Sequence, residues 1–229
     1  MNIIVACEYS ARVRDAFLAR GHYAWSCDLL PTDGDPENHY IGNILDGLDY
    51  ETGGFFESIE WDLMVAHPPC TYLTGAAEWA FADNPMIKGK PRNIKAGTLV
   101  GAERRQARED ALDFIKKLWE LPIPRICIEN PVGIITRRLP ELGKPQYVHP
   151  YNFNDDASKK TGLWLKGLPP LKQTKRFNGR IVEHNGKIVE RWSNQTDSGQ
   201  NKLPPSEDRW KLRSYTYQGI ADAMAGQWG

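Results

Sequence analysis

The stretch DLMVAHPPCTY, residues 62–72, decides the fold of this 229-residue chain. Residues 63–66 form a short apolar run of the kind that fills a sheet buried on both faces. Pro68 and Pro69 lack an N–H group and fix φ near about −65°, so the strand cannot continue through them. Cys70 is therefore expected on a rigid corner at a strand end, where open α/β sheets hold their ligand crevice. Most free cysteines are small buried hydrophobic residues, so the position alone is also consistent with a packing role for Cys70.

The composition predicts one domain with a small appendage, because 229 residues suffice for one well-buried core. The 29 basic and 29 acidic residues give zero formal net charge, so any basic surface for a polyanion must be local. We expect no membrane span and no secretory signal, since the opening apolar run is short and no run approaches ~20 residues. The cysteines form no CxxC pair, which argues against zinc and disulfides and favours a reducing cytoplasm; they are Cys7, Cys27, Cys70 and Cys127.

The first 28 residues predict a strand–helix–strand unit. Residues 2–7 are a continuous apolar strand, Ser10 is a candidate N-cap for a helix that ends at Gly21, and residues 22–27 are a second strand. Asp28 closes that strand, in the place where nucleoside-binding units carry a carboxylate for ribose hydroxyls. A solvated loop carboxylate is the alternative for Asp28.

The turn after the first strand reads CEYSA, residues 7–11, and contains no glycine. A pyrophosphate needs glycines for close approach to the backbone, so this turn argues against a dinucleotide. It suits a cofactor without phosphates, of which S-adenosylmethionine is the obvious candidate.

Further elements follow from the apolar pattern and the turn residues. Two features stand out: a buried strand at 125–129 that ends at Asn130-Pro131, and a hairpin at 180–192 with an Asn-Gly turn. The hairpin should pair Ile181-Val182 with Ile188-Val189. The other predictions are a short strand at 41–46, a long loop at 72–99, a helix at 102–121, a short helix at 134–142, strands at 146–153 and 162–168, a loop at 193–208 and a helix at 219–228.

Basic residues concentrate in the long loop and the helix after it, with Glu103 the only acid among them and with Tyr72, Trp79 and Phe81 nearby. A basic, aromatic-bearing lid directly after a cysteine nucleophile suits a polyanion substrate. A merely solvated basic loop is the alternative. The basic residues are Lys88, Lys90, Arg92, Lys95, Arg104, Arg105 and Arg108.

Two strand ends carry the chemistry. If Cys70 and Glu129 follow neighbouring parallel strands, a thiol and a carboxyl face the same crevice. A pyrimidine ring is electron-poor at C6, so a thiolate can add there and make C5 nucleophilic, while a carboxyl at N3 and the exocyclic amino group stabilises the developing charge. C5 can then attack an electrophilic methyl group, and loss of the C5 proton expels the thiol.

These residues resemble a known family. Pro68-Pro69-Cys70 is similar to the Pro-Cys motif of cytosine-5 DNA methyltransferases, and Glu129-Asn130-Pro131 is similar to their Glu-Asn-Val motif. The resemblance implies Cys70 as the nucleophile, Glu129 as the cytosine contact and Asn130 as support for the loop of the glutamate. It also implies an α/β fold, the Rossmann-like S-adenosylmethionine-dependent methyltransferase fold, with a mostly parallel, doubly wound sheet and here a small β-hairpin insert. The stretches 67–73 and 159–165 further resemble a short phage or prophage subgroup, which implies the cytoplasm of a bacterial or phage-infected cell and a role in restriction-modification.

The resemblance implies S-adenosylmethionine as the cofactor and DNA, duplex or single-stranded, as the partner. The family carries Phe-x-Gly-x-Gly where this chain has residues 8–11, and often an aspartate where this chain has Asn43. The residues expected at the cofactor are Cys7, Glu8, Tyr9, Ser10, Asp28, Asn43, Asp46 and Pro68. Those expected on DNA are Lys88, Lys90, Arg92, Lys95, Arg104 and Arg105, with Lys159 and Lys160 as substitutes for an arginine pair that the sequence lacks.

The chain should divide into a catalytic and cofactor-binding part at 1–165, a recognition insert at 166–212 and a closing helix at 213–229. An insert this short can touch few base pairs, which predicts relaxed sequence specificity or a single-stranded substrate. A base in duplex DNA must also be flipped out of the stack. Trp79 is a candidate wedge, although ordinary aromatic packing explains it equally.

Two other functions stay open. A related enzyme could carry out the same ring chemistry on a free nucleotide or a single strand, or the chain could be a catalytically silent DNA-binding protein on a methyltransferase scaffold. A zinc deaminase is excluded, because its Pro-Cys-x-x-Cys motif would need a cysteine where Leu73 stands. The sequence does not set the oligomeric state.

Overall fold

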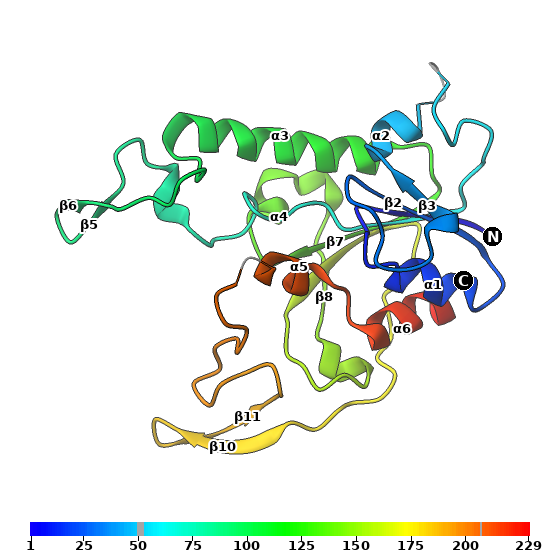
Figure 1. Ribbon diagram of the computed structural model, residues 1–229. Helices are drawn as coiled ribbons and strands as arrows, with labels where there is room; N and C mark the ends of the chain where they lie inside the picture. The colour runs from blue at the N-terminus through cyan, green and yellow to red at the C-terminus, as the bar shows by residue number, and fades with distance from the viewer. Residues whose placement is uncertain (50–52, 207) are drawn as a thin grey trace.

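A seven-stranded sheet forms the centre of the computed structural model, which describes residues 1–49, 53–206 and 208–229 (Figure 1). The strand order is β3-β2-β1-β4-β7-β9-β8, and β9 runs antiparallel to both of its neighbours while the others are parallel to one another. The strands are β1 (Asn2–Ala6), β2 (Tyr23–Asp28), β3 (His39–Ile41), β4 (Leu63–Ala66), β7 (Arg125–Pro131), β8 (Gln146–Val148) and β9 (Thr161–Lys166).

The direction of winding reverses between β1 and β4. From β1 the chain proceeds outward to β2 and β3, and it then returns to the other side of β1 to form β4 and β7. Such a reversal leaves a crevice outside the carboxyl ends of the two middle strands. The predicted mostly parallel, doubly wound sheet is confirmed, and with one reversed strand near the far edge it has the Rossmann-like methyltransferase arrangement.

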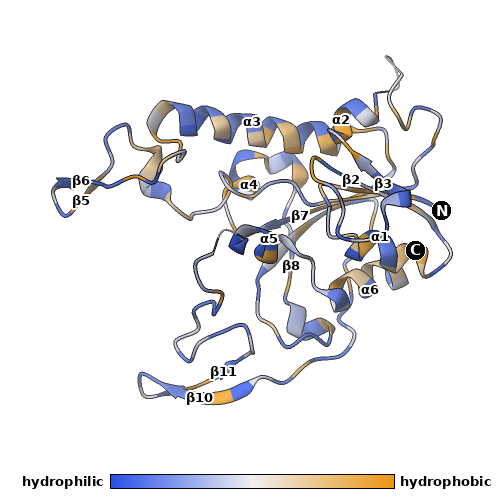
Figure 2. Cartoon of the chain, viewed as in Figure 1, coloured by the Kyte–Doolittle hydropathy of each residue, from blue (hydrophilic) through white to orange (hydrophobic). Residues whose placement is uncertain are grey.

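The central strands are buried on both faces, as their unbroken apolar runs predict. In β1, Ile4 and Ala6 face one core and Ile3 and Val5 face the other. The first core is covered by α2 (Ile44–Gly47), α3 (Gly101–Glu120) and α4 (Ile135–Arg138), and the second by α1 (Arg12–Leu18) and α6 (Gln218–Trp228) (Figure 1). Figure 2 shows the apolar residues gathered in the central strands and in α6, whereas the projecting hairpins are mostly polar.

Three local predictions are wrong. The strand predicted at 146–153 ends at Val148, because Pro150 lacks an N–H group and begins the 3-10 turn η4 (Pro150–Phe153). Ser10 does not cap α1; the N-cap is Ala11, and the carboxylate of Glu8 instead accepts hydrogen bonds from the N–H groups of Val13 and Arg14. The strand predicted at 41–46 ends at Ile41, because the side chain of Asn43 accepts from the N–H of Leu45 and starts the short helix α2. A single buried carboxylate and an N-cap thus override the apolar pattern.

Two arms project from the sheet (Figure 1). The first, which we call the lid, comprises η2 (Glu78–Phe81) and a small hairpin of β5 (Met86–Ile87) and β6 (Lys90–Pro91). The second is the predicted hairpin, β10 (Arg180–His184) and β11 (Lys187–Arg191). Both turns have positive φ at both central residues, at 88–89 and 185–186, which is the type I′ geometry that strand twist favours.

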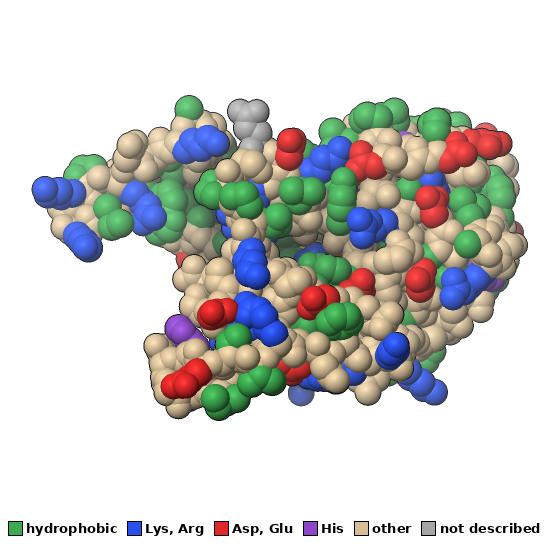
Figure 3. Space-filling model, turned by 60° about the horizontal axis from the view of Figure 1, so that its bottom comes forward, with side chains coloured by type: hydrophobic (Ala, Val, Ile, Leu, Met, Phe, Trp, Pro, Cys, Tyr) green, Lys and Arg blue, Asp and Glu red, His purple; other side chains and the backbone are tan. Residues whose placement is uncertain are grey.

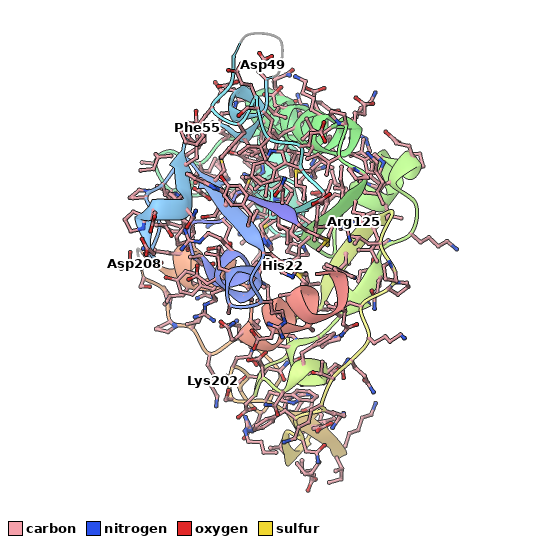
Figure 4. The ribbon with its side chains drawn as sticks, turned by 90° about the vertical axis from the view of Figure 1, so that its right-hand side faces the viewer. His22, Asp49, Phe55, Arg125, Lys202 and Asp208 are labelled. Atoms are coloured by element: carbon pink, nitrogen blue, oxygen red, sulfur yellow. The ribbon has the colours of Figure 1, made fainter. Side chains whose placement is uncertain are left out.

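The register of the second hairpin agrees only in part with the prediction. Val182 lies opposite Val189, but Ile181 lies opposite Glu190 and Glu183 opposite Ile188. From this hairpin the chain returns to the sheet: Figure 4 shows Lys202 on the lower part of the molecule and Asp208 back beside the sheet. A short helix that the sequence did not predict, α5 (Arg209–Ser214), follows and leads into α6.

The remaining short elements are 3-10 turns: η1 (Pro36–Asn38), η3 (Pro140–Leu142) and η4 (Pro150–Phe153). Within the described ranges no helix is both long and apolar enough to cross a membrane.

Candidate active site

The two strand ends singled out by the sequence lie side by side. Strands β4 and β7 are parallel neighbours with Ala66 opposite Ile128, so the next residues, His67 and Glu129, emerge together at the carboxyl edge of the sheet. Nδ1 of His67 lies 2.8 Å from Oε2 of Glu129, and each side chain is only 11% exposed. The site is therefore built around a buried imidazole–carboxylate pair.

Two hydrogen bonds tie the loop after β4 to the end of β7 and the loop beyond it. The side-chain amide of Asn130, within β7, donates a 2.8 Å hydrogen bond to the carbonyl of Pro68, and the N–H of Ile134 donates to the carbonyl of Leu73 at 2.9 Å. A Cβ on Gly133 would lie 2.0 Å from that carbonyl oxygen of Leu73, so only glycine fits there. The two loops thus form one framework.

Cys70 lies on this framework. Its carbonyl accepts from the N–H groups of Leu73 and Thr74, and its free thiol is half-buried. The structure therefore brings Cys70, Glu129 and Asn130 to one edge of the sheet, as the sequence predicted for their strands. Sequence reasoning assigned no role to His67, although a titratable residue between a buried strand and a candidate nucleophile was a usable signal.

The buried pair is ionised by mutual attraction. Burial by itself raises the pKa of Glu129, but His67, Lys159 and the hydroxyl of Thr216 outweigh it and lower that pKa well below its ordinary value. Burial lowers the pKa of His67, but Glu129 and then Glu8 raise it above its ordinary value. Each shift favours the charged form of its group, so the mutual attraction favours an imidazolium–carboxylate pair.

Thr216 is a site residue that sequence reasoning missed. It is 4% exposed and its Oγ1 donates to Oε2 of Glu129 at 3.3 Å. Two buried polar atoms on β7 and just after β4, Oδ1 of Asn130 and Nε2 of His67, have no hydrogen-bond partner among the described residues. No local motif marks Thr216, because it reaches the site only through the path of the chain between α5 and α6.

A small pocket of about 50 Å³ lies at the point where the winding of the sheet reverses. This is the crevice where doubly wound sheets bind ligands. Its walls come from the turn after β1, the end of β4 and the segment after α5; the lining residues are Cys7, Glu8, Tyr9, Ser10, His67, Ser214 and Thr216. The four predicted cofactor residues at 7–10 thus lie together at the crevice.

The turn after β1 adopts glycine-like geometry without glycine. Cys7 has φ of 58° and Ala11 of 59°, conformations that cost a non-glycine residue about 1–2 kcal/mol each. Glu8 is buried, accepts from Val13 and Arg14, and takes a hydrogen bond from Ser10 as well. The start of α1, where an anionic ligand group would find free N–H groups, is therefore filled by the protein's own carboxylate.

The other predicted cofactor residues are more dispersed. Asp28 ends β2 beside the crevice; burial raises its pKa, and the charge of Asp28 in turn raises the pKa of Cys7, for which burial is the larger cause. Pro68 is buried and serves the site through its carbonyl. Asn43 and Asp46 are exposed and bond to each other at the start of α2, so both have a local structural role.

The segment 209–216 closes the pocket, and we call it the strap. The hydroxyl of Tyr9 lies 2.8 Å from the carbonyl of Lys211, to which it donates, and 2.7 Å from Oγ of Ser214. Asp33 accepts from Nζ of Lys211 at 2.8 Å and from the hydroxyl of Tyr215. Ligand pockets commonly measure about 300–1,000 Å³, so a nucleoside would enter only if the strap shifts.

Loosening the strap should therefore help a nucleoside cofactor to bind. We expect Asp33→Ala to tighten S-adenosylmethionine binding by about two- to fivefold, the range that breaking one partly exposed ion pair provides. Isothermal titration calorimetry measures the change. Asp197→Ala, which breaks a similar ion pair with Arg180 on the second hairpin, is the matched control; weaker binding in Asp33→Ala would show that the strap helps to hold the cofactor instead.

The lid is fastened to α3 by three of the predicted basic residues. Arg104 is 5% exposed and lies over the rings of Tyr72 and Phe81. Arg105 donates to the carbonyl of Phe81 and to Asp83, and Arg108 pairs with Glu78. These guanidinium groups hold the lid in place. Little of the Arg104 side chain is therefore exposed to bind a ligand.

The remaining predicted DNA contacts divide into two groups. Lys88 and Lys90 are exposed on the lid and Lys95 is exposed on the segment that follows it, and Figure 3 shows Lys and Arg side chains along this projecting arm. Arg92 lies 4.0 Å above the ring of Trp79, so Trp79 is half-buried in the lid and not a protruding wedge.

Lys159 and Lys160 are separated by the structure. The Nζ of Lys159 donates to the carbonyl of Arg213, and its charge lowers the pKa of Glu129. Lys160 lies over the ring of Tyr147 on β8, at the edge of the sheet. Lys159 alone of this pair thus lies near the candidate site.

No protein-family model and no curated protein sequence matches the chain. Among solved structures, it is similar to a crystal structure of an E. coli protein provisionally assigned as a DNA modification methyltransferase encoded within a prophage. The identity is 12% and the TM-score 0.39, over 72% of this chain and 46% of the other. The chain thus spans less than half of that protein, and the fold assignment stands on the sheet order given above.

Proposed function

We propose that the protein is a DNA (cytosine-5)-methyltransferase that transfers a methyl group from S-adenosylmethionine to C5 of cytosine through a covalent adduct at Cys70. One observation carries the proposal: a half-buried free thiol and an ionised carboxylate come from adjacent strand ends whose loops are bonded together. Thiol, carboxylate and supporting amide at one sheet edge are the groups that this chemistry needs.

In the proposed mechanism the Cys70 thiolate adds to C6 of the ring, and the electron pair that is displaced is stabilised at N3 by a hydrogen bond from the protonated carboxyl of Glu129. C5 becomes nucleophilic as a result. Asn130 fixes the loop of the glutamate through the Pro68 carbonyl. S-adenosylmethionine, when bound, supplies the electrophilic methyl group; loss of the C5 proton then breaks the C6–sulfur bond.

The crevice residues fit this cofactor by position and donor type. The turn at 7–10 would line its amino-acid part, and Asp28 at the end of β2 would meet ribose hydroxyls. The filled start of α1 suits a cofactor without phosphates, since Glu8 already uses the N–H groups that a pyrophosphate would need.

The DNA would lie along the lid, which carries exposed lysines and is fastened to α3 next to Cys70. Figure 3 shows a hollow between this projecting arm and the lower lobe of the molecule. A DNA strand held in this hollow would bring a flipped base toward the carboxyl ends of β4 and β7.

Charge removal on the lid tests this placement. Replacing Lys88 and Lys90 by Gln should weaken DNA binding and lower the magnitude of the slope of log K against log salt by about 0.7–0.9 for each phosphate that is no longer neutralised. Fluorescence anisotropy with a labelled oligonucleotide at several salt concentrations measures it. The matched control removes Lys116 and Lys117 on α3, which pair with acids on their own helix; equal slopes in both variants would remove the lid from this role.

The activity itself is tested by incubating the protein with DNA and S-adenosylmethionine, digesting the DNA to nucleosides and weighing the products. A mass increase of deoxycytidine by one methyl group supports the proposal. The small pocket favours one alternative, a catalytically silent DNA-binding protein. Calorimetry that detects DNA binding but no S-adenosylmethionine binding would select this alternative.

A further inference from the structure

His67 takes no part in the mechanism proposed above, yet it makes the closest charged contact of the site, 2.8 Å from Glu129. Burying two charges is costly unless they are paired, so a charged imidazole between two strand ends calls for a reason. The chemistry of the target ring provides one.

A neutral cytosine presents a lone pair at N3, and an ionised carboxylate presents only lone pairs in return. One proton must therefore lie between Glu129 and N3. The need grows during the reaction, because addition of the thiolate at C6 moves an electron pair onto N3 and makes this nitrogen basic. Glu129 is ill suited to bring that proton itself, since its pKa is lowered in this site.

The surroundings of His67 favour an imidazolium. Three carboxylates act on it, Glu129 from β7, Glu8 from the turn before α1 and Asp28 from the end of β2, against one ammonium group, Lys159, before β9. Two groups this close titrate as a unit, so the proton that they share belongs to the pair. We assign this proton to the 2.8 Å contact between Nδ1 and Oε2.

We infer that His67 stores the proton that N3 of the target cytosine receives and passes it through the carboxyl of Glu129. This inference rests on the proposed function. His67 is a positioning residue, because it acts on the ring only through Glu129.

Each bond that breaks in this transfer is matched by one that forms. The Nδ1–H bond of His67 breaks and an O–H bond forms on Glu129. The neutral carboxyl turns about its Cγ–Cδ bond and gives the proton to N3 while the Cys70–C6 bond forms. Glu129 is free to make this rotation. Both side chains that bond to its carboxylate, His67 and Thr216, bond to Oε2, and no hydrogen bond reaches Oε1 within the described part of the chain. When C5 loses its proton to a water molecule and the thiolate leaves, the N3 proton returns to the pair.

Exchange of the C5 hydrogen in deuterated water tests the inference without any methyl donor. Thiolate addition lets C5 take up a deuteron and lose its proton before the thiolate leaves, and mass spectrometry of a cytosine oligonucleotide follows it. Because the thiol must ionise in both proteins, the informative quantity is the rate of His67→Gln divided by the wild-type rate at each pH. In His67→Gln the ring proton must come from solution, so this ratio should fall about tenfold for each pH unit between about pH 6 and 8.

The controls separate the possible failures. His22→Gln changes a histidine that packs on Phe17 of α1 and lies apart from Asp208 (Figure 4), so it should keep the wild-type profile. A His67→Gln profile parallel to the wild type overturns the inference. Absence of exchange in the wild type, or exchange that survives Cys70→Ser, overturns the proposed function and this inference with it.

A measurement on the wild type covers the case in which His67→Gln does not fold. In ¹⁵N-histidine-labelled protein at neutral pH, the nitrogen shifts of His67 should be those of an imidazolium. In the trapped adduct with a 5-fluorocytosine oligonucleotide and the methyl donor, N3 carries the proton and His67 should be neutral. An imidazolium in both states overturns the inference.

Discussion

Cys70→Ser is expected to abolish methyl transfer to DNA and the covalent adduct with a 5-fluorocytosine oligonucleotide. The serine hydroxyl is far less acidic than a thiol and no base lies beside it in the proposed mechanism, so the rate should fall by roughly 10⁴-fold or more. Denaturing gel electrophoresis detects the adduct, and labelled methyl groups report transfer.

The matched control is Cys27→Ser. Cys27 is buried and its thiol donates to the carbonyl of Gly42, a bond that a hydroxyl can also make, so this variant should keep the adduct. Transfer that persists in Cys70→Ser at the wild-type rate would exclude a covalent mechanism at this residue.

Glu129→Ala is expected to produce the second large effect, on stability as well as on rate. Removing one partner of a buried ion pair leaves the other uncompensated, so the free energy of unfolding should fall by about 3 kcal/mol near pH 6. The rate of transfer should fall by about 10²–10³-fold, because the charge on the ring loses its main stabilisation. Urea unfolding and methyl transfer measure the two effects.

The pKa shifts of Glu129 and His67 predict how the loss of stability in Glu129→Ala depends on pH. The lowered pKa of Glu129 contributes stability above the unfolded value, about 4.3, that is lost as the pH falls through the folded value. The raised pKa of His67 contributes stability below the unfolded value, about 6.5, that is lost as the pH rises through the folded value. The difference between wild type and Glu129→Ala should therefore be largest between about pH 4.3 and 6.5; a difference independent of pH would contradict the ion pair.

The sequence predicted the parts of this protein that depend on local pattern. Prolines after a buried run correctly predicted the end of β4 before Cys70, whereas β7 runs two residues past the predicted end at Glu129 and includes Pro131. The Asn-Gly turn predicted the second hairpin, and the apolar stripe predicted α3. In these elements a single side chain, or the regular spacing of apolar residues, determines the backbone conformation.

What depends on contacts between distant segments could not be predicted. Thr216 reaches Glu129 from 87 residues away, and the strap that carries it has exposed Trp210 and Leu212, so α5 shows no helical apolar face to recognise. Arg104 looked like a surface cation because only the folded lid shows that rings surround it. Local pattern also misassigned the start of α1, where a carboxylate bonds to the helix from outside it.

The contact between Gly133 and the Leu73 carbonyl has a consequence for motion. Since no side chain fits between the two loops, they have no room to slide past each other, and a displacement of one carries the other with it. The spacing of the backbone at Cys70 and Glu129 therefore stays constant, and only side-chain rotations change the distance between the thiol and the carboxylate.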